Sequence, residues 1–291
     1  MTPRVDAHQH YWRIAARAGY WPPRDLAAIH RDFGPEDLAP ELDAGRIDGT
    51  VLVQSLPNDE DTRYLLDLSE RTGSVWAVVG WVDLKAADAA DSVARFAAHP
   101  KARGLRPMLQ DLSDDTWIDD PALDVAVGAM LAHQLSFDAL VMPRHLDSLH
   151  AFALRYPDLP IVIDHGAKPN IALDELPSWL PKMVRLASLP NVHCKLSGLW
   201  TEAGALAEGS ALRARSRPYV RVLADLFGRQ RLMWGSDWPV LRLAAGCTRY
   251  GEWLAACEAD CESGLGSAAL ADIFGGNACR FYRIGTPGHP T

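Results

Sequence analysis

The sequence of 291 residues lacks several features that mark whole classes of proteins. It contains no block of about five or six like charges and no tract rich in Lys and Arg, so nucleic acids and anionic membranes are poor partners. The formal net charge of −8 is spread along the chain. No run of about 18 apolar residues is present, so nothing is expected to span a membrane. A secretory signal is also missing from the N-terminus.

Cysteine is scarce and odd in number. The five cysteines lie in the last third of the chain, at Cys194, Cys247, Cys257, Cys261 and Cys279. Without an export signal they are expected to be reduced thiols, which predicts a cytoplasmic protein. What is present is the composition of an ordinary globular protein, with 48% hydrophobic and 23% charged residues.

Eight short β-rich runs recur along the chain, at 4–6, 50–54, 75–82, 104–108, 136–141, 161–164, 192–196 and 231–235. Stretches with helical periodicity separate them, at 59–71, 86–98, 123–133, 147–156, 176–189 and 219–227. Parallel strands need crossover helices and a closed barrel has no sheet edge, so the pattern predicts an α/β fold, the (β/α)₈ barrel. A doubly wound open sheet is the alternative, which the lack of a Gly-x-Gly-x-x-Gly motif disfavours.

The predicted barrel forms a single domain over residues 1–284, followed by a loose tail at 285–291 that is rich in Gly and Pro. The longest stretch without a predicted strand is 12–40. It contains a helix start at Pro35-Glu36-Asp37-Leu38. We expect it to form a loop and a short helix over one mouth of the barrel.

Ionisable side chains stand at the ends of several predicted strands. His8 and His10 lie two residues apart, a spacing that directs both imidazoles to one face of a strand and suits a metal or proton-transfer site. Two buried-strand patterns end on His165 and Asp237, where an apolar core would not supply an ionisable group without a reason. Because barrel active sites lie at the C-terminal ends of strands, these four residues are predicted to share one site.

Five further strand-end residues are predicted to contact the substrate, namely Gln54, Arg106, Asp138, Lys168 and Lys195. Buried cations need partners, so Arg106 and Lys195 are each expected to meet a carboxylate, either of the substrate or of Asp138. Four tryptophans offer flat apolar faces that suit either a substrate ring or core packing, namely Trp12, Trp117, Trp200 and Trp238.

With these residues in view, the chain resembles the amidohydrolase superfamily, and within it the L-fuconolactonase and L-rhamnonolactonase-like branch of sugar lactonases. The resemblance covers nearly the whole chain. It rests on phrases that occur in the same order at 6–12 (DAHQHYW), 51–54 (VLVQ), 79–84 (VGWVDL), 104–111 (GLRPMLQD), 137–141 (FDALV), 163–169 (IDHGAKP), 194–199 (CKLSGL) and 233–240 (MWGSDWPV). It implies an active centre of His8, His10, His165 and Asp237.

The resemblance also bears on metal content. Binuclear members of the superfamily use a Lys or Glu after strand four and a His at strand five, where this chain has Arg106 and Asp138. Arginine stays protonated and is a poor metal ligand, so two metal ions are not expected. Two alternatives stay open: one divalent ion, with zinc the first choice, held by the same His8, His10, His165 and Asp237, or none at all.

The activity implied is hydrolysis of a small lactone, a sugar-acid lactone of the L-fucono-, L-rhamnono- or L-galactono- type. Asp237 would act as general base, and the three histidines would hold the water or stabilise the oxyanion. Three alternatives are a metal-dependent decarboxylase of an aromatic acid with Arg106 and Lys195 on its carboxylate, a hydrolase of a non-sugar lactone, and a barrel that binds a sugar acid without turnover. The expected partner is the small lactone, and a homo-oligomer is compatible with the sequence.

Overall fold

The structure is a computed structural model that describes residues 2–17, 20–204, 209–244 and 250–285. Eight parallel strands pair in chain order in one sheet, as β1 (Val5–Gln9), β2 (Gly49–Val53), β3 (Val75–Gly80), β4 (Ala102–Leu105), β5 (Ser136–Ala139), β6 (Ile161–Ile163), β7 (Val192–Leu196) and β8 (Leu232–Trp234). The predicted (β/α)₈ barrel is confirmed. The fourth strand ends earlier than expected, so Arg106 lies on the loop that follows β4.

Backbone hydrogen bonds join the ends of the first and last strands and thereby close the barrel. The amide of Asp237 donates to the carbonyl of His8 at 2.8 Å, and the amide of His10 donates to the carbonyl of Trp238 at 2.8 Å. Beside them, the buried Asp6 accepts from the amides of His8 and Ser236 at 3.1 and 2.8 Å. Burial raises the pKa of Asp6 to about 6, although these hydrogen bonds oppose the shift.

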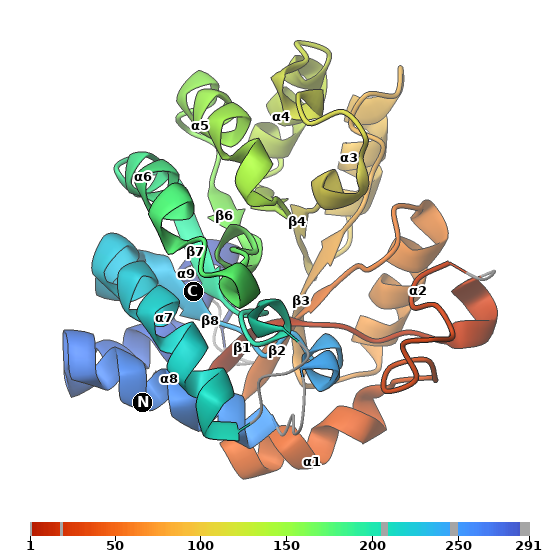
Figure 1. The fold of residues 1–291 in the computed structure, drawn as a ribbon. Coiled ribbons are helices and arrows are strands. Elements are labelled where there is room, and N and C mark those ends of the chain that lie inside the picture. The colour runs from red at the N-terminus through yellow and green to blue at the C-terminus, as the bar shows by residue number, and fades with distance from the viewer. Residues whose placement is uncertain (1, 18–19, 205–208, 245–249, 286–291) are drawn as a thin grey trace.

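Helices surround the strands, as Figure 1 shows. Their bounds are α1 (Pro35–Gly45), α2 (Asp59–Glu70), α3 (Ala89–Ala97), α4 (Leu123–Ala132), α5 (Leu146–Arg155), α6 (Leu176–Ala187), α7 (Gly209–Arg231), α8 (Tyr250–Leu265) and α9 (Asn277–Tyr282). All six predicted helices are present. The one expected at 219–227 is longer than predicted, because α7 continues through Pro218, and α8 and α9 were not predicted.

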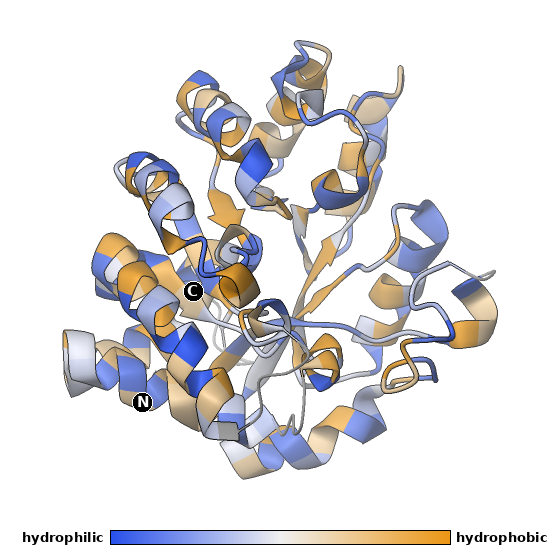
Figure 2. Ribbon diagram, in the orientation of Figure 1, coloured by the Kyte–Doolittle hydropathy of each residue, from blue (hydrophilic) through white to orange (hydrophobic). Residues whose placement is uncertain are grey.

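Apolar side chains fill two layers. One cluster lies inside the barrel and includes Val51, Val53 and Val79 from the strands together with Phe281 and Tyr282 from α9. The larger cluster lies between the strands and the surrounding helices. Figure 2 shows the corresponding pattern of apolar strands and helices whose surfaces alternate between apolar and polar residues. This packing fixes the strand ends that carry the polar residues described below.

The segment after β1 turns back over the barrel mouth, as predicted. Trp12 and Phe33 pair at the base of the segment, with two backbone hydrogen bonds of 3.0 Å. The buried Arg17 contacts Ser55 after β2 and lies 3.6 Å from Asp61 on α2, which ties the segment to the strand ends. In the part of the chain that is described, no helix is long and apolar enough to cross a membrane. The tail predicted to be loose falls almost entirely at 286–291, outside the described residues.

Candidate active site

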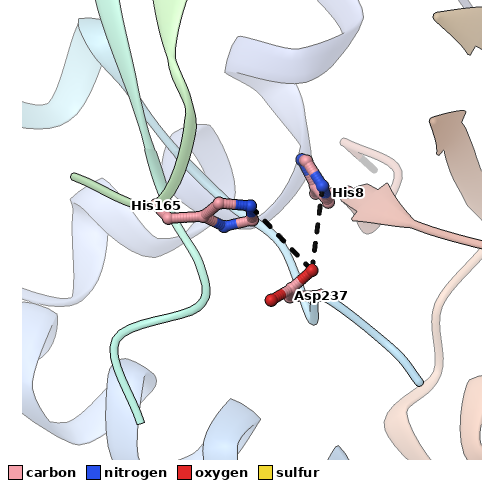
Figure 3. A group of neighbouring side chains, drawn as sticks. All are labelled: His8, His165 and Asp237. Carbon is pink, nitrogen blue, oxygen red and sulfur yellow. Dashed lines mark ion pairs between the residues drawn. The ribbon is translucent and has the colours of Figure 1, made fainter. Parts of the chain in front are cut away.

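Four ionisable side chains from three different strand ends meet at the C-terminal mouth of the barrel. The Oδ1 atom of Asp237 lies 3.4 Å from Nε2 of His10, 3.8 Å from Nε2 of His8 and 4.0 Å from Nε2 of His165. The Nε2 atoms of His8 and His10 are 3.2 Å apart. Figure 3 shows His8 and His165 directed toward Asp237. The convergence predicted from the sequence is therefore present in space.

The backbone around the centre is held in uncommon conformations. His165 and Asp237 have φ values of 54° and 57°, in the left-handed region that non-glycine residues rarely occupy. Such conformations persist where the surrounding structure enforces them, and they concentrate at functional sites. Gly198 contributes to this enforcement, because a Cβ atom built on it would lie 2.6 Å from Nδ1 of His165. The loop after β7 thus packs directly on the imidazole.

Hydrogen bonds fix the orientation of two of the imidazoles. Nδ1 of His10 donates to the carbonyl of Val53 at 2.7 Å, which leaves its Nε2 with a free lone pair. Nδ1 of His165 hydrogen-bonds Oγ of Ser197 at 2.9 Å. Both rings therefore present Nε2 to the centre, the arrangement that second-shell partners impose on metal-binding or proton-transferring histidines.

Burial keeps His8 and His165 neutral, and the neighbours of Asp237 keep its carboxylate ionised. Desolvation lowers the pKa of His165 to about 4 and that of His8 well below its usual value, so both rings are uncharged near neutral pH. Burial alone would raise the pKa of Asp237, but the imidazoles around it, with His165 first, outweigh burial and lower this pKa. The centre thus combines two neutral imidazoles, His8 and His165, with one anionic carboxylate.

A buried network of charges lies directly beneath the centre. Nζ of Lys195 donates to Asp138 at 2.7 Å, and it lies 3.0 Å from Oδ1 of Asp164 and 3.2 Å from Nδ1 of His8. Arg106 donates to the other oxygen of Asp164 at 3.2 Å, and the hydroxyl of Tyr282 donates to Asp138 at 2.6 Å. Two cations thus face two carboxylates.

This network changes the roles expected for three predicted substrate contacts. Asp138 and Lys195 are fully buried and pair with each other. Of the two carboxylate partners expected for Lys195, the substrate or Asp138, the structure shows Asp138. Gln54 is also fully buried, and its amide donates to the carbonyl of Arg106 at 2.6 Å. None of the three is among the described residues that line the cavity, and all three contact residues beneath the centre.

A cavity of about 550 Å³ opens above the centre. His10, His165, Asp237, Arg106 and Lys168 line it, so five of the predicted site residues face the space a substrate would occupy. The remaining lining residues come from the loops after β1, β2, β4, β5, β7 and β8 and comprise Tyr20, Trp21, Ser55, Leu56, Pro57, Met108, Gln110, Asp111, Leu140, Thr201, Glu202, Val240 and Leu243. A cavity of this size suits a small molecule.

The four predicted tryptophans do not line this cavity. Trp12, Trp200 and Trp238 are buried in the core, and Trp117 packs under the ammonium of Lys85 at 4.5 Å. The aromatic residue that the sequence interpretation missed is Trp21, which lies on the cavity wall together with the exposed Tyr20. Its position in the segment already expected to cover the mouth was the available signal.

The centre also meets the requirements of a single metal site. One ligand atom from each of His8, His165 and Asp237 lies within 4.8 Å of the others, all three side chains are buried, and Nε2 of His10 joins them. Nitrogen and carboxylate ligands of this kind suit zinc and related divalent ions. Among the described residues, the places that hold a second ion in binuclear members are taken up otherwise, because Arg106 lies 3.5 Å from His8 and Asp138 is bound by Lys195 and Tyr282.

The fold and the centre together define a (β/α)₈ barrel with a His and Asp constellation on its catalytic face. Residues 5–284 match the family model described as amidohydrolase. The chain therefore belongs to the amidohydrolase family, as the sequence resemblance predicted.

Two similar proteins are both described as L-fucono-1,5-lactonases. The chain is 61% identical over 287 residues to the L-fucono-1,5-lactonase of Burkholderia ambifaria, covering 99% of this chain and 98% of that protein. It is 36% identical over 294 residues to the L-fucono-1,5-lactonase of Burkholderia multivorans, covering 98% and 97%. Among solved structures, an amidohydrolase from Burkholderia multivorans with bound zinc superposes with a TM-score of 0.91 at 36% identity, covering 97% of this chain and 100% of that one.

Proposed function

We propose that this protein is a lactonase that opens a neutral sugar-acid lactone, with L-fucono-1,5-lactone as the first candidate substrate. The observation that carries the proposal is the 61% identity, over almost the whole of both chains, to a protein of that activity. The site supports it, because a His and Asp centre lies at the base of a cavity with both polar and apolar walls. The prediction made from the sequence points to the same activity.

In the proposed mechanism, Asp237 is the general base. Its ionised carboxylate accepts a proton from a water molecule, whose oxygen forms a bond to the lactone carbonyl carbon. Arg106, which reaches the cavity wall, supplies hydrogen-bond donors toward the oxygen that becomes negative, and Nε2 of His10 can accept a hydrogen bond that holds the attacking water. The ring C–O bond then breaks, and the protonated Asp237 returns its proton to the leaving alkoxide. The product is a linear hydroxy acid.

The residues present also fit a divalent ion. His8, His10, His165 and Asp237 would hold it, and we propose zinc because their ligand set suits it and the related Burkholderia multivorans structure contains it. Such an ion, when bound, supplies Lewis acidity toward a carbonyl and a water. Neutral His8 and His165 are in the protonation state that metal binding requires.

The buried charges argue against the alternative of an aromatic-acid decarboxylase. That activity would use Arg106 and Lys195 as a clamp for a substrate carboxylate. In the structure, Lys195 is fully buried between Asp138 and Asp164, and Arg106 is paired with Asp164. Both cations already have carboxylate partners within the protein, so a neutral substrate suits the site better.

The test is an acid-release assay on a panel of aldonolactones, run beside an absorbance assay on aromatic acids, with wild type and Asp237→Asn. Wild type is expected to hydrolyse L-fucono-1,5-lactone. Asp237→Asn is expected to lower kcat by about 10²- to 10⁴-fold while the protein stays folded, because the amide accepts no proton from water. Asp225→Asn, an exposed position on α7, is the matched control. Near-normal turnover in Asp237→Asn would remove the general-base role.

Metal content is tested separately. Elemental analysis of the purified protein should find about one divalent ion per chain. Chelation should lower thermal stability and readdition of the ion should restore it, since binding to the folded state stabilises it.

We also propose a cytoplasmic location. Cys194, Cys257, Cys261 and Cys279 are free thiols in the described part of the chain, which fits a reducing compartment.

A further inference from the structure

Two groups of residues that line the cavity face each other from opposite sides of the barrel mouth. The strands follow one another in the order β1 to β8, so the ends of β6 and β7 face the ends of β2 and β3 across the mouth. Lys168 follows β6, and Thr201 and Glu202 follow β7, whereas Leu56 and Pro57 follow β2. A ligand between them meets hydrogen-bonding groups on one side and apolar groups on the other.

Lys168 and Glu202 form an ion pair on this wall. Nζ of Lys168 lies 2.9 Å from Oε1 of Glu202, and the side chains are 24% and 21% exposed. Within the described ranges, it is the one pair of a lysine or arginine with a carboxylate in which both partners line the cavity. Neither side chain hydrogen-bonds another described residue. An ammonium has three donors and a carboxylate about four acceptor positions, so both keep capacity for a ligand.

This pair combines the two functions that recognition of a hydroxyl group needs. A hydroxyl donates one hydrogen bond and accepts others, so a carboxylate beside an ammonium complements adjacent hydroxyls on a ring. Hydrogen bonds to charged groups are stronger than those between neutral groups. Across the mouth, Trp21, Leu56 and Pro57 offer an apolar surface to the C–H groups of the same ring.

We propose that Lys168 and Glu202 are specificity-determining residues that recognise ring hydroxyls of the lactone. Glu202 accepts a hydrogen bond from one hydroxyl, and Lys168 donates to the same oxygen or its neighbour. The inference rests on the proposed sugar-lactone hydrolysis and adds the groups that select a hydroxylated ring. Because the two charges cancel, this wall also attracts a neutral lactone without favouring a carboxylate.

The experiment is a thermodynamic cycle between protein and substrate. kcat/KM is measured for wild type and Glu202→Gln on L-fucono-1,5-lactone and on lactones that each lack one ring hydroxyl. In wild type, removing the recognised hydroxyl should lower kcat/KM by about 10- to 100-fold, because a charged hydrogen bond is lost. In Glu202→Gln, the parent lactone should show a similar loss, and removing that hydroxyl should then have little further effect.

Glu258→Gln is the matched control. Glu258 pairs with Arg4 at 2.7 Å with 32% and 33% exposure, and Arg4 precedes β1 at the opposite end of the barrel. Glu258→Gln should therefore leave every kcat/KM value unchanged. Purely additive losses in Glu202→Gln for every hydroxyl, or no loss at all, overturn the inference while leaving the lactonase proposal intact. Absence of wild-type hydrolysis of any sugar lactone overturns the proposed function and the inference with it.

Discussion

Lys195 is a fully buried cation, and its three partners explain why the protein tolerates it. Asp138, Asp164 and His8 surround its ammonium, with two carboxylates and one ring nitrogen 2.7 to 3.2 Å from Nζ. Burial raises the pKa of Asp138 in spite of this contact, while Lys195, His8 and Arg106 overcome burial and lower that of Asp164. The ammonium therefore positions His8 from below.

We expect Lys195→Met to lower the free energy of unfolding by about 3 to 5 kcal/mol, because it leaves the buried Asp138 without its cation and Asp164 with only one of its two. Urea unfolding followed by circular dichroism measures this. The control is Lys182→Met, which breaks a largely exposed pair with Asp147 and should cost less than about 1 kcal/mol. Equal effects of the two substitutions would show that the buried network is not what makes Lys195 important.

At the scale of elements, the loop after β7 determines where the β6 histidine lies. Gly198 has a φ of 62°, and its α-carbon packs against the ring of His165. Ser197 holds the same ring by a hydrogen bond. One short loop therefore sets both the distance and the rotation of a catalytic imidazole that a different strand supplies.

Gly198→Ala should lower kcat by about 100-fold or more, since a displacement of about 1 Å in a catalytic group costs this much. Gly228→Ala is the matched control, because Gly228 has a similar φ of 60° but no atom within 4 Å of an added Cβ. Both variants place an alanine at a positive φ, and the strain at Gly228 is the greater, because its ψ of −169° puts it in a region essentially restricted to glycine; only Gly198→Ala displaces His165. Steady-state lactonase kinetics, with thermal melting to compare stabilities, separate strain from displacement. Similar kinetics in both variants would contradict the positioning role.

The helices, strands and loops also show which features of the structure could be predicted from the sequence. Strand ends were predictable, because apolar runs that stop at His165 and Asp237 carry a periodic signal. The direction in which each side chain points was not predictable. Residue type alone does not say whether Trp200 faces the cavity or the core, and Asp138 and Lys195 follow the same pattern as true cavity residues. Trp21 and Glu202 stand on loops, where the sequence has no periodicity to report direction.

For the whole molecule, buried neutral histidines link stability to pH. Burial, reinforced by the charges of Arg231 and Arg280, lowers the pKa of His193 to about 4, below its ordinary value of 6.5. Between these two pH values the unfolded chain binds a proton that the folded chain does not. Protonation therefore stabilises the unfolded state as pH falls. The contribution of neutral His193 to the free energy of unfolding is lost progressively below about pH 6.5.

His193→Gln should flatten this dependence by about 2 to 3 kcal/mol between pH 7 and pH 4.5, because the variant has no proton to take up on unfolding. Chemical denaturation at a series of pH values measures the difference between variant and wild type. His133→Gln, at an exposed position after α4, serves as the control. A constant difference at every pH would show that His193 does not contribute to acid sensitivity.

The closure of the barrel has a consequence for how the enzyme comes to be active. Asp6 joins β1 to the amide of Ser236, 230 positions along the chain, and His8 and Asp237 lie on the two segments that this contact joins. A refolding or nascent chain can form helices and most of its strand pairs before this contact exists. Catalysis then begins only when the last strand docks on the first, so regained activity should lag behind regained helix content.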